Sequence, residues 1–261
     1  MKFFTSIILF LNLTTAYATP DFCFNTKEVN NKLIITGYRE THEWCDPKYI
    51  NIPDSIGGVD VVAIEPEVFY QKGLEQLTLG RSIKVIYDHQ FEGNNIKGSL
   101  SIPPSVEYIG ESAFRGNQIN RVYITNGIGS MAHLMCYYGG DSHLDRYICY
   151  DEDEGPIYNK GITSIEVFQN AFADNQIEQL TITGYPFLRE DVFKNNKINM
   201  VKVDNSLLLD FYKKAFNSSF AESVEVKVKH PCNDLMSAMN TESKEGCPKE
   251  YKFMFNPVIN L

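Results

Sequence analysis

The chain has 261 residues, of which 43% are hydrophobic and 13% aromatic, with 24 basic against 33 acidic side chains. This apolar content excludes a fully disordered chain, and the acidic balance, without a lysine or arginine cluster, argues against nucleic acid or an anionic membrane surface as a partner. The length suits one or two globular domains or a single solenoid of stacked repeats.

Residues 1–18 have the pattern of a secretory signal peptide. Lys2 gives a positive start, Phe3 to Leu13 form an apolar stretch, and Ala16-Tyr17-Ala18 is a small-x-small cleavage site. The apolar stretch is shorter than the ~20 residues that a membrane span requires. We therefore expect cleavage after Ala18, no membrane insertion, and a soluble protein that is secreted, periplasmic or held at the cell surface.

Residues 19–49 are predicted to form an N-terminal cap. Cys23 and Cys45 bracket a strand-like run that includes Leu33 and Ile35. The first coil of a solenoid would otherwise expose its core edge, so a covering segment is needed there. We expect a Cys23–Cys45 disulfide to close this cap. Trp44, the only tryptophan, is expected to pack inside the cap, and stacking on a ligand is the alternative.

Residues 50–228 carry a repeat that is marked by a phenylalanine in a buried-looking context. The spacing of this anchor is 21 to 23 residues, except for one gap of 58. A fixed period near 22 indicates one supersecondary unit copied along an axis, in which stacked copies bury one another's apolar columns. The anchors are Phe69, Phe91, Phe114, Phe172, Phe193 and Phe216.

Other apolar columns keep their spacing from these anchors. Five residues before each anchor stand Ile64, Ile86, Ile109, Val167, Leu188 and Phe211, and five residues after stand Leu74, Ile96, Ile119, Ile177, Ile198 and the weaker Ala221. Alternating pairs follow at Ile50/Ile52, Leu77/Leu79, Leu100/Ile102, Val122/Ile124, Leu180/Ile182, Val201/Val203 and Val224/Val226. Period-2 alternation predicts strands with one face buried, and consecutive copies predict a parallel sheet. The pair Leu100/Ile102 comes one residue late, so residues 97–99 hold a one-residue insertion.

An asparagine stands three places after most anchors, at Asn94, Asn117, Asn175 and Asn196. Asparagine tolerates the left-handed region and bonds nearby backbone, so the pattern predicts a turn at these positions.

The unit from Ile102 to Ile124 resembles the BspA-type leucine-rich repeat, with the consensus I-P-x-S-V-x-x-I-G-x-x-A-F-x-x-N-x-L-x-x-V-x-I. It matches at Ile102-Pro103, Ser105-Val106, Ile109-Gly110, Ala113-Phe114 and Asn117. The resemblance covers about Ile50 to Val228 and implies an α/β-type, mostly β, repeat solenoid with a parallel β-sheet on one face. The resemblance also implies a surface or secreted protein, and some proteins of this family act as adhesins.

The 58-residue gap contains an insertion, residues 126–160, rich in tyrosine, glycine and acidic side chains. Long ordered loops in repeat proteins are often functional, and tyrosines are typical of recognition surfaces, although they also fill space over a disulfide loop. We expect a Cys136–Cys149 disulfide to tie this loop across its middle. Its candidate partner-binding residues are Tyr137, Tyr138, Tyr147 and Tyr150.

Metal binding in the insertion is the less favoured alternative. His133, Cys136, His143 and Cys149 have the residue types of a zinc site. Six cysteines in three sequence-adjacent pairs in an exported protein favour disulfides instead. The acidic run at residues 151–154 matches no calcium-loop spacing, so we expect a solvated run and no metal or other cofactor.

The predicted strands leave two outward columns on the sheet. One lies between the members of each pair and includes Thr78, Tyr123 and Thr181, and the other lies just before each pair and includes Arg121. Solenoids commonly bind partners on such a face, and a polar, mostly uncharged surface suits a protein or a carbohydrate. Threonine and serine also occur on exposed ladders for their β-propensity alone.

Residues 229–261 are predicted to form a C-terminal cap. A Cys232–Cys247 disulfide would enclose a short helix near residues 233–239, and Tyr251 to Phe255 would add a closing strand.

No catalytic set is present in the sequence: there is no nucleophile elbow, HExxH motif or glycine-rich phosphate loop. His89 stands two residues before Phe91 and is expected at the surface. We predict a non-enzymatic protein that binds a protein or glycan through the strand face, the tyrosine-rich loop or both. The alternatives are an envelope scaffold without a tight ligand and a hydrolase using His133 or His143.

Overall fold

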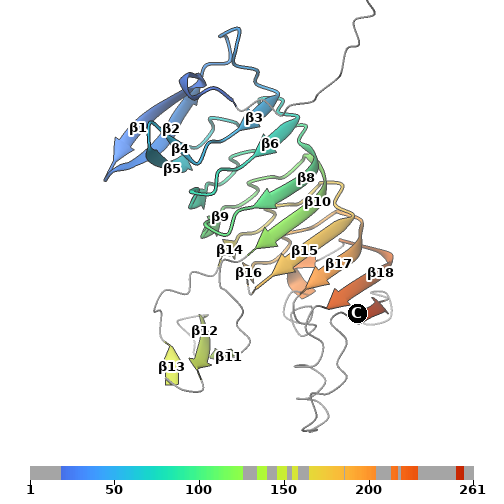
Figure 1. Ribbon diagram of the computed structural model, residues 1–261. Helices are drawn as coiled ribbons and strands as arrows, with labels where there is room; N and C mark the ends of the chain where they lie inside the picture. The colour runs from blue at the N-terminus through green and yellow to red at the C-terminus, as the bar shows by residue number, and fades with distance from the viewer. Residues whose placement is uncertain are drawn as a thin grey trace, which may run out of the picture.

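The computed structural model is an elongated stack of short coils, in which strands of successive coils lie side by side (Figure 1). This arrangement confirms the predicted repeat solenoid. The structure describes residues 19–125, 134–139, 146–151, 155–157, 165–184, 186–203, 213–216, 219–228 and 251–255.

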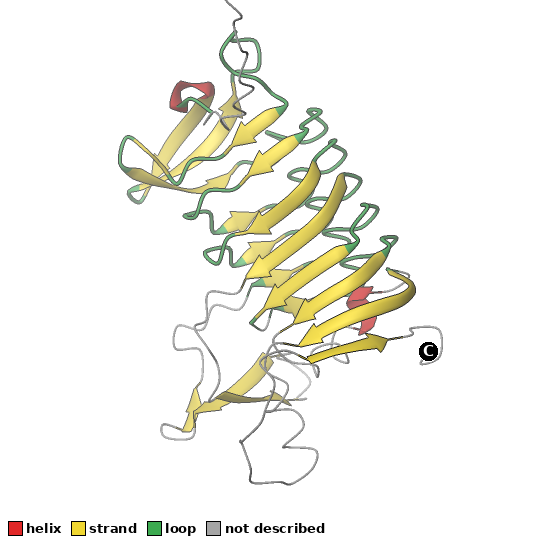
Figure 2. Ribbon diagram, turned by 45° about the vertical axis from the view of Figure 1, so that its right-hand side comes forward, coloured by secondary structure: helices red, strands yellow, loops and turns green. Residues whose placement is uncertain are grey.

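The longer strands form one face of the solenoid, which we call the strand face (Figure 2). Their order in the sheet is β19-β18-β17-β15-β10-β8, and all neighbours are parallel except β18 and β19. The register places Val122 beside Leu100 and Leu180, so equivalent residues of successive copies stack as predicted. The bounds are β8 (Lys97–Ile102), β10 (Gln118–Thr125), β15 (Gln179–Thr183), β17 (Ile198–Val203), β18 (Phe220–Val228) and β19 (Tyr251–Phe255).

The strand face is not one continuous sheet. β3 (Tyr49–Asn51) and β6 (Gln76–Thr78) form a separate parallel pair, and the ladder stops between β6 and β8. This break coincides with the predicted one-residue insertion at residues 97–99, where Gly98 takes the left-handed φ of 80°. An extra residue displaces the hydrogen-bonding groups of one strand from those of its neighbour.

A second sheet runs along the solenoid in the order β1-β2-β5-β7-β9-β14-β16, with β4 paired to β5, and its strands from β7 onward have only two residues each. Most coils therefore contribute one strand to each layer, and the apolar columns fill the space between them. The bounds are β1 (Phe24–Val29), β2 (Lys32–Tyr38), β4 (Ser55–Ile56), β5 (Val59–Ile64), β7 (Val85–Ile86), β9 (Tyr108–Ile109), β14 (Glu166–Val167) and β16 (Phe187–Leu188). The remaining elements are η1 (Asp21–Cys23), η2 (Lys213–Phe216) and an antiparallel sheet of β11 (Leu134–Gly139), β12 (Arg146–Asp151) and β13 (Gly155–Ile157).

The six anchor phenylalanines form a single file of stacked rings, as predicted. Each is at most 2% exposed, and neighbouring ring centroids lie 5.2 to 5.8 Å apart with interplanar angles of 6° to 17°. Phe114 and Phe172 are 5.2 Å apart, so the file passes the insertion without a gap. Tyr38 and Phe24 extend the file at one end, and Phe220 extends it at the other.

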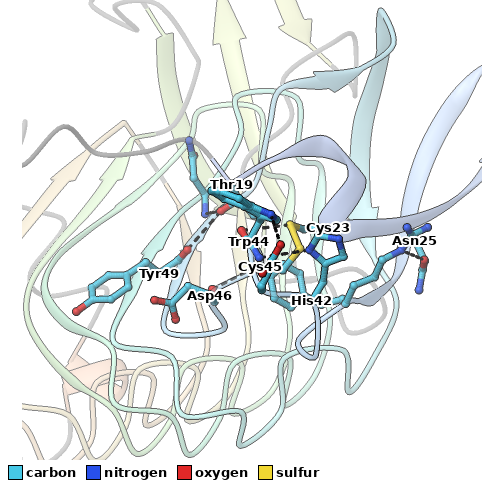
Figure 3. Close-up of a disulfide and its surroundings, with 12 residues drawn as sticks. Thr19, Cys23, Asn25, His42, Trp44, Cys45, Asp46 and Tyr49 are labelled. Atoms are coloured by element: carbon cyan, nitrogen blue, oxygen red, sulfur yellow. Dashed lines mark hydrogen bonds between the residues drawn. A yellow bond between two sulfur atoms is a disulfide. The ribbon is translucent and has the colours of Figure 1, made fainter.

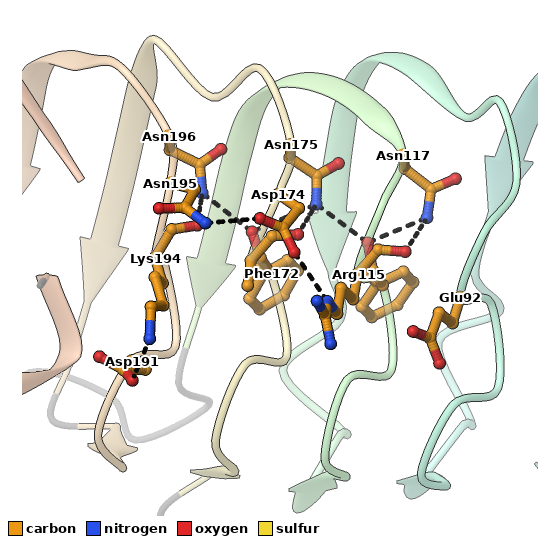
Figure 4. A network of polar contacts seen from close by, with 12 residues as sticks. Glu92, Arg115, Asn117, Phe172, Asp174, Asn175, Asp191, Lys194, Asn195 and Asn196 are labelled. Carbon is orange, nitrogen blue, oxygen red and sulfur yellow. Dashed lines mark hydrogen bonds and ion pairs between the residues drawn. The ribbon is translucent and has the colours of Figure 1, made fainter. Parts of the chain in front are cut away.

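The asparagines that follow the anchors are buried and link successive coils (Figure 4). The Nδ2 of Asn117 donates to the carbonyls of Phe91 and Phe114, both at 2.9 Å, and its Oδ1 accepts from the amide of Ile96 at 3.0 Å. Asn94, Asn175 and Asn196 repeat these bonds. Ser219 takes the fifth position, with its buried hydroxyl donating to the carbonyl of Phe193 at 2.7 Å.

The side-chain bonds of these four asparagines form a ladder along the solenoid. The prediction that the asparagines themselves make the turn is wrong, since none of the four has a positive φ. The left-handed residues instead stand two places before and two places after an anchor. They are Glu67, His89, Ser112, Asn170 and Asp191 before it, and Gln71, Gly93, Gly116, Asp174 and Asn195 after it. The chain turns at these flanking positions, and the asparagine satisfies the backbone groups that the turn leaves inside.

The register of the last strand also differs from the prediction. Val226 and Val228, and not Val224 and Val226, lie beside Val201 and Val203. β18 pairs irregularly with β17 between Ile198 and Met200, so it enters the sheet two residues later than the earlier copies do. The antiparallel partner β19 lies where a closing strand at Tyr251 to Phe255 was predicted.

At the N-terminus, Cys23 and Cys45 form a disulfide (Figure 3). Thr19 is buried beside it: its Oγ1 donates to the carbonyl of Tyr49 and accepts from the amide of Asn51. The prediction that Trp44 packs inside this segment is wrong, because its side chain is 69% exposed. The interior is already filled by the two cysteines and by Ile35, and Tyr38 is the aromatic residue that meets the phenylalanine file.

We predict that Asn117→Leu destabilises the protein by about 3 kcal/mol, because it leaves two buried carbonyls and one buried amide without their partner. Urea unfolding followed by circular dichroism measures this change. The neighbouring Asn95→Ala, at an exposed position, should change stability by about 0.5 kcal/mol or less. Equal losses in the two variants would contradict a structural role for the ladder.

The double substitution Cys23→Ala/Cys45→Ala is expected to lower the free energy of unfolding by about 3 kcal/mol. The bond closes a loop with a sequence separation of 22, and removing it restores chain entropy to the unfolded state. The urea midpoint of the double variant, compared with that of the oxidised parent, tests this expectation. An unchanged midpoint would show that the disulfide contributes little.

Candidate binding surface

The centre of the strand face is built around Tyr123. β10 holds its backbone in register with Ser101 of β8 on one side and Thr181 of β15 on the other. Val122 and Ile124 point inward and are fully buried, so alternation turns Tyr123 outward, where it is 38% exposed. Its two neighbours in this column, Ser101 and Thr181, have smaller side chains.

The second outward column places Arg121 between Ser99 and Gln179. Arg121 is exposed, and its column neighbours carry no charge. The middle of the strand face therefore presents one aromatic ring and one cation among hydroxyl and amide groups.

The charges near the β3–β6 end of the face are engaged with one another. Glu75 accepts from Lys48 at 3.0 Å and from Lys97 at 2.7 Å, which joins three coils. The hydrogen bonds from Lys97 and Lys48 lower the pKa of the Glu75 carboxyl, and the same bonds raise the pKa of both lysines. Exposed pairs of this kind add little stability, so their main effect is to neutralise this edge.

The structure brings together only some of the predicted binding residues. Arg121, Tyr123 and Thr181 are neighbours, whereas Thr78 lies in the separate β3–β6 sheet. Glu225, predicted between the members of the last pair, instead lies beside Met200 in the flanking column. Lys227 takes the central position beside Lys202.

The predicted residues of the insertion are described only through their backbone. Tyr138 lies opposite Tyr147, Tyr150 lies opposite Met135, and Tyr137 lies opposite Ile148 in the antiparallel pair of β11 and β12. Cys136 and Cys149 are also directly opposite, a register that is compatible with the predicted disulfide. Cys232, Cys247, His133 and His143 lie outside the described residues.

An aromatic group that the sequence pattern did not predict lies on the second sheet. Tyr108 and Phe168 have ring centroids 4.8 Å apart, and the guanidinium of Arg189 lies 4.4 Å from the ring centroid of Phe187 and 5.4 Å from that of Phe168. Arg189 also donates to Glu166 at 2.6 Å. The sequence did contain a signal for this group. Its aromatic residues stand directly beside the apolar positions that lie five residues before the anchors, on the outward side of the two-residue strands. Because Arg189 already covers these rings, we assign them a packing role.

The described part of the chain offers no sign of catalysis or metal binding. It contains no group of three or more His, Cys, Asp or Glu residues that could hold a metal ion. His89 is exposed, as predicted, and its Nδ1 lies 2.5 Å from a carboxylate oxygen of Glu92. No helix among the described residues is long and apolar enough to cross a membrane.

The architecture is that of a leucine-rich repeat solenoid. It has two layers of short, mostly parallel strands, inward apolar columns and a buried asparagine ladder. The family model for the BspA type leucine rich repeat region matches residues 23–139 and 157–237 in six copies, and the chain belongs to this family. No curated protein and no solved structure matches the chain. Members are typically exported bacterial surface proteins and generally non-enzymatic, and repeats of this kind suggest a role in protein interaction.

The corrected register of β18 makes a prediction of its own. Lys202 and Lys227 lie directly opposite each other, and like charges at such positions are destabilising. Lys227→Glu is therefore expected to raise the free energy of unfolding by about 0.2 to 1 kcal/mol at low salt, measured by urea unfolding. Glu225→Lys, two residues earlier and beside Met200, should give no such gain. No gain with Lys227→Glu, together with a clear loss with Glu225→Lys, would instead favour the register in which Glu225 lies beside Lys202.

Proposed function

We propose that this protein is exported by a cleaved signal peptide and binds another macromolecule, a protein or a glycan, through the strand face. The observation that supports this most directly is the outward cluster of Tyr123, Arg121 and Thr181 on the rigid ladder of β8, β10 and β15. Tyrosine and arginine are the residue types that most often dominate binding energy at interfaces.

The surroundings of this cluster support docking of an extended partner. Ser99, Ser101, Gln179 and Thr181 are short or flexible and polar, so a partner can approach the sheet closely and find hydrogen-bond groups. The backbone beneath them is fixed by parallel pairing on both sides of β10. A surface that is already ordered loses little conformational entropy on binding.

The insertion is proposed as a second contact. Residues 126–160 follow directly after Thr125, the last residue of the strand that carries Arg121 and Tyr123. A tyrosine-rich loop that leaves the end of this strand would extend the same binding surface.

The experiment is capture of purified candidate proteins and an array of glycans by the immobilised chain beginning at Thr19. For any partner found, Arg121→Ala/Tyr123→Ala should weaken binding about tenfold or more, equivalent to about 1.4 kcal/mol. The control is Tyr87→Ala, which removes a ring of similar exposure, 37%, directly after β7 of the second sheet and should leave binding unchanged.

Deletion of residues 129–156 separates the two proposed contacts. Loss of capture with an unchanged β-rich far-UV spectrum would assign the main contact to the insertion. Full capture by the deletion variant would assign it to the strand face. Equal binding by all variants would contradict both contacts, and an absence of any partner would favour a structural role.

A further inference from the structure

The N-terminal segment exposes aromatic side chains on both sides of its disulfide. Phe22 precedes Cys23 and is 48% exposed, and Trp44 precedes Cys45 and is 69% exposed. The ring of His42 lies 5.1 Å from that of Phe22, and its Nδ1 accepts from the backbone amide of Trp44 at 3.3 Å. The Cys23–Cys45 bond thus ties together two separate stretches of chain, each of which carries exposed aromatic side chains.

A carboxylate, that of Glu43, is held beside the indole ring of Trp44. The indole Nε1 of Trp44 donates to a carboxylate oxygen of Glu43 at 2.8 Å, so the polar edge of the ring is satisfied by an anion. Nearby acidic residues have other partners: Glu40 pairs with Lys72, and Asp46 accepts from the amide of Lys48. We define the aromatic patch as Phe22, His42, Glu43 and Trp44.

An exposed indole face next to a carboxylate selects for cations. The electron-rich face of tryptophan attracts an ammonium or guanidinium group, and a carboxylate beside the ring adds an ion pair with the same group. An anionic ligand would be repelled by Glu43 and by the acidic balance of the whole chain, 33 acidic against 24 basic residues. The paired rings of Phe22 and His42 are a second exposed apolar element of the same disulfide-linked segment.

We propose that the aromatic patch docks a basic segment of a protein partner, with a lysine or arginine side chain over the indole of Trp44 and in contact with Glu43. This site is separate from the strand face and does not depend on it. The disulfide holds both stretches of the patch in place, which limits the entropy lost on docking. Membership of the family fixes the repeat fold, but it does not fix the side chains of Glu43 and Trp44 on which this contact depends.

The single tryptophan provides a direct readout, because all indole emission comes from Trp44. The probe is an acetylated, amidated octapeptide of alternating glycine and arginine, titrated at low salt, and the matched probe replaces arginine with glutamine. We expect saturable change in Trp44 emission with the arginine peptide, at least about threefold weaker binding when ionic strength rises above physiological, and no saturable change with the glutamine peptide.

Three variants of the full chain assign the contact. Glu43→Gln keeps a hydrogen-bond acceptor for the indole and should weaken binding of the arginine peptide about threefold to tenfold. Trp44→Ser, followed by calorimetry, should lose a similar or larger factor. Glu28→Gln removes an exposed carboxylate from β1 outside the patch and should leave the affinity unchanged. Thermal unfolding confirms that each variant is folded.

Each alternative gives a distinct result. Equal binding of the two peptides would show a purely apolar surface. Saturable binding of cellohexaose in preference to the arginine peptide would show a sugar platform. Unchanged binding by Glu43→Gln and Trp44→Ser would show attraction to the overall acidic charge. Any of these results would overturn the proposal.

Discussion

Buried side-chain amides hold the coils of this solenoid together. Each tight turn around an anchor phenylalanine leaves carbonyl groups pointing into an apolar interior, where an unpaired polar group costs about 1–3 kcal/mol. In the four coils that carry it, an asparagine satisfies two of these carbonyls and one amide, and in doing so it bonds to the preceding coil. The ring file and the two sheets depend on this solution, because without it the turns could not lie inside the stack.

The same arrangement explains why so few residue types are used at the core positions. An anchor ring must be flat to lie about 5 Å from the rings above and below, close to the spacing of adjacent strands. The residue three places later must offer donors and an acceptor together, which asparagine does and an apolar residue does not. Ser219 offers a single hydroxyl at this position, in the last coil with a described anchor.

The sequence predicted the fold well because the fold is a repetition. Apolar columns such as Ile109 and Val122 appear at constant offsets, so each copy supports the interpretation of the others. The wrong predictions about β18 and Trp44 concern features that occur only once in the chain, so the other copies of the repeat say nothing about them. The register of β18 was missed because its irregular pairing occurs once, and Trp44 was placed inside because hydrophobicity alone cannot show that Ile35 and the disulfide already fill that space.

The candidate site was harder to predict than the fold, for a physical reason. Inward residues are constrained by the neighbouring coil, whereas outward residues such as Thr78 and Thr181 are compatible with both binding and bare solvent. Only the three-dimensional register shows that Arg121, Tyr123 and Thr181 adjoin while Thr78 belongs to another sheet. The aromatic patch depends on a covalent bond between distant stretches of chain, and no local pattern in the sequence contains it.

The close stacking of Phe114 on Phe172 has a consequence for how such a protein can change over evolutionary time. The two rings are 5.2 Å apart although 58 positions separate them along the chain, so the body of the molecule closes as tightly there as between ordinary neighbours. Insertions, deletions or recombination at this point could lengthen, shorten or replace the inserted segment while the spacing between successive coils stays constant. A lineage could thus diversify what it recognises at one junction without reinventing the scaffold that carries it.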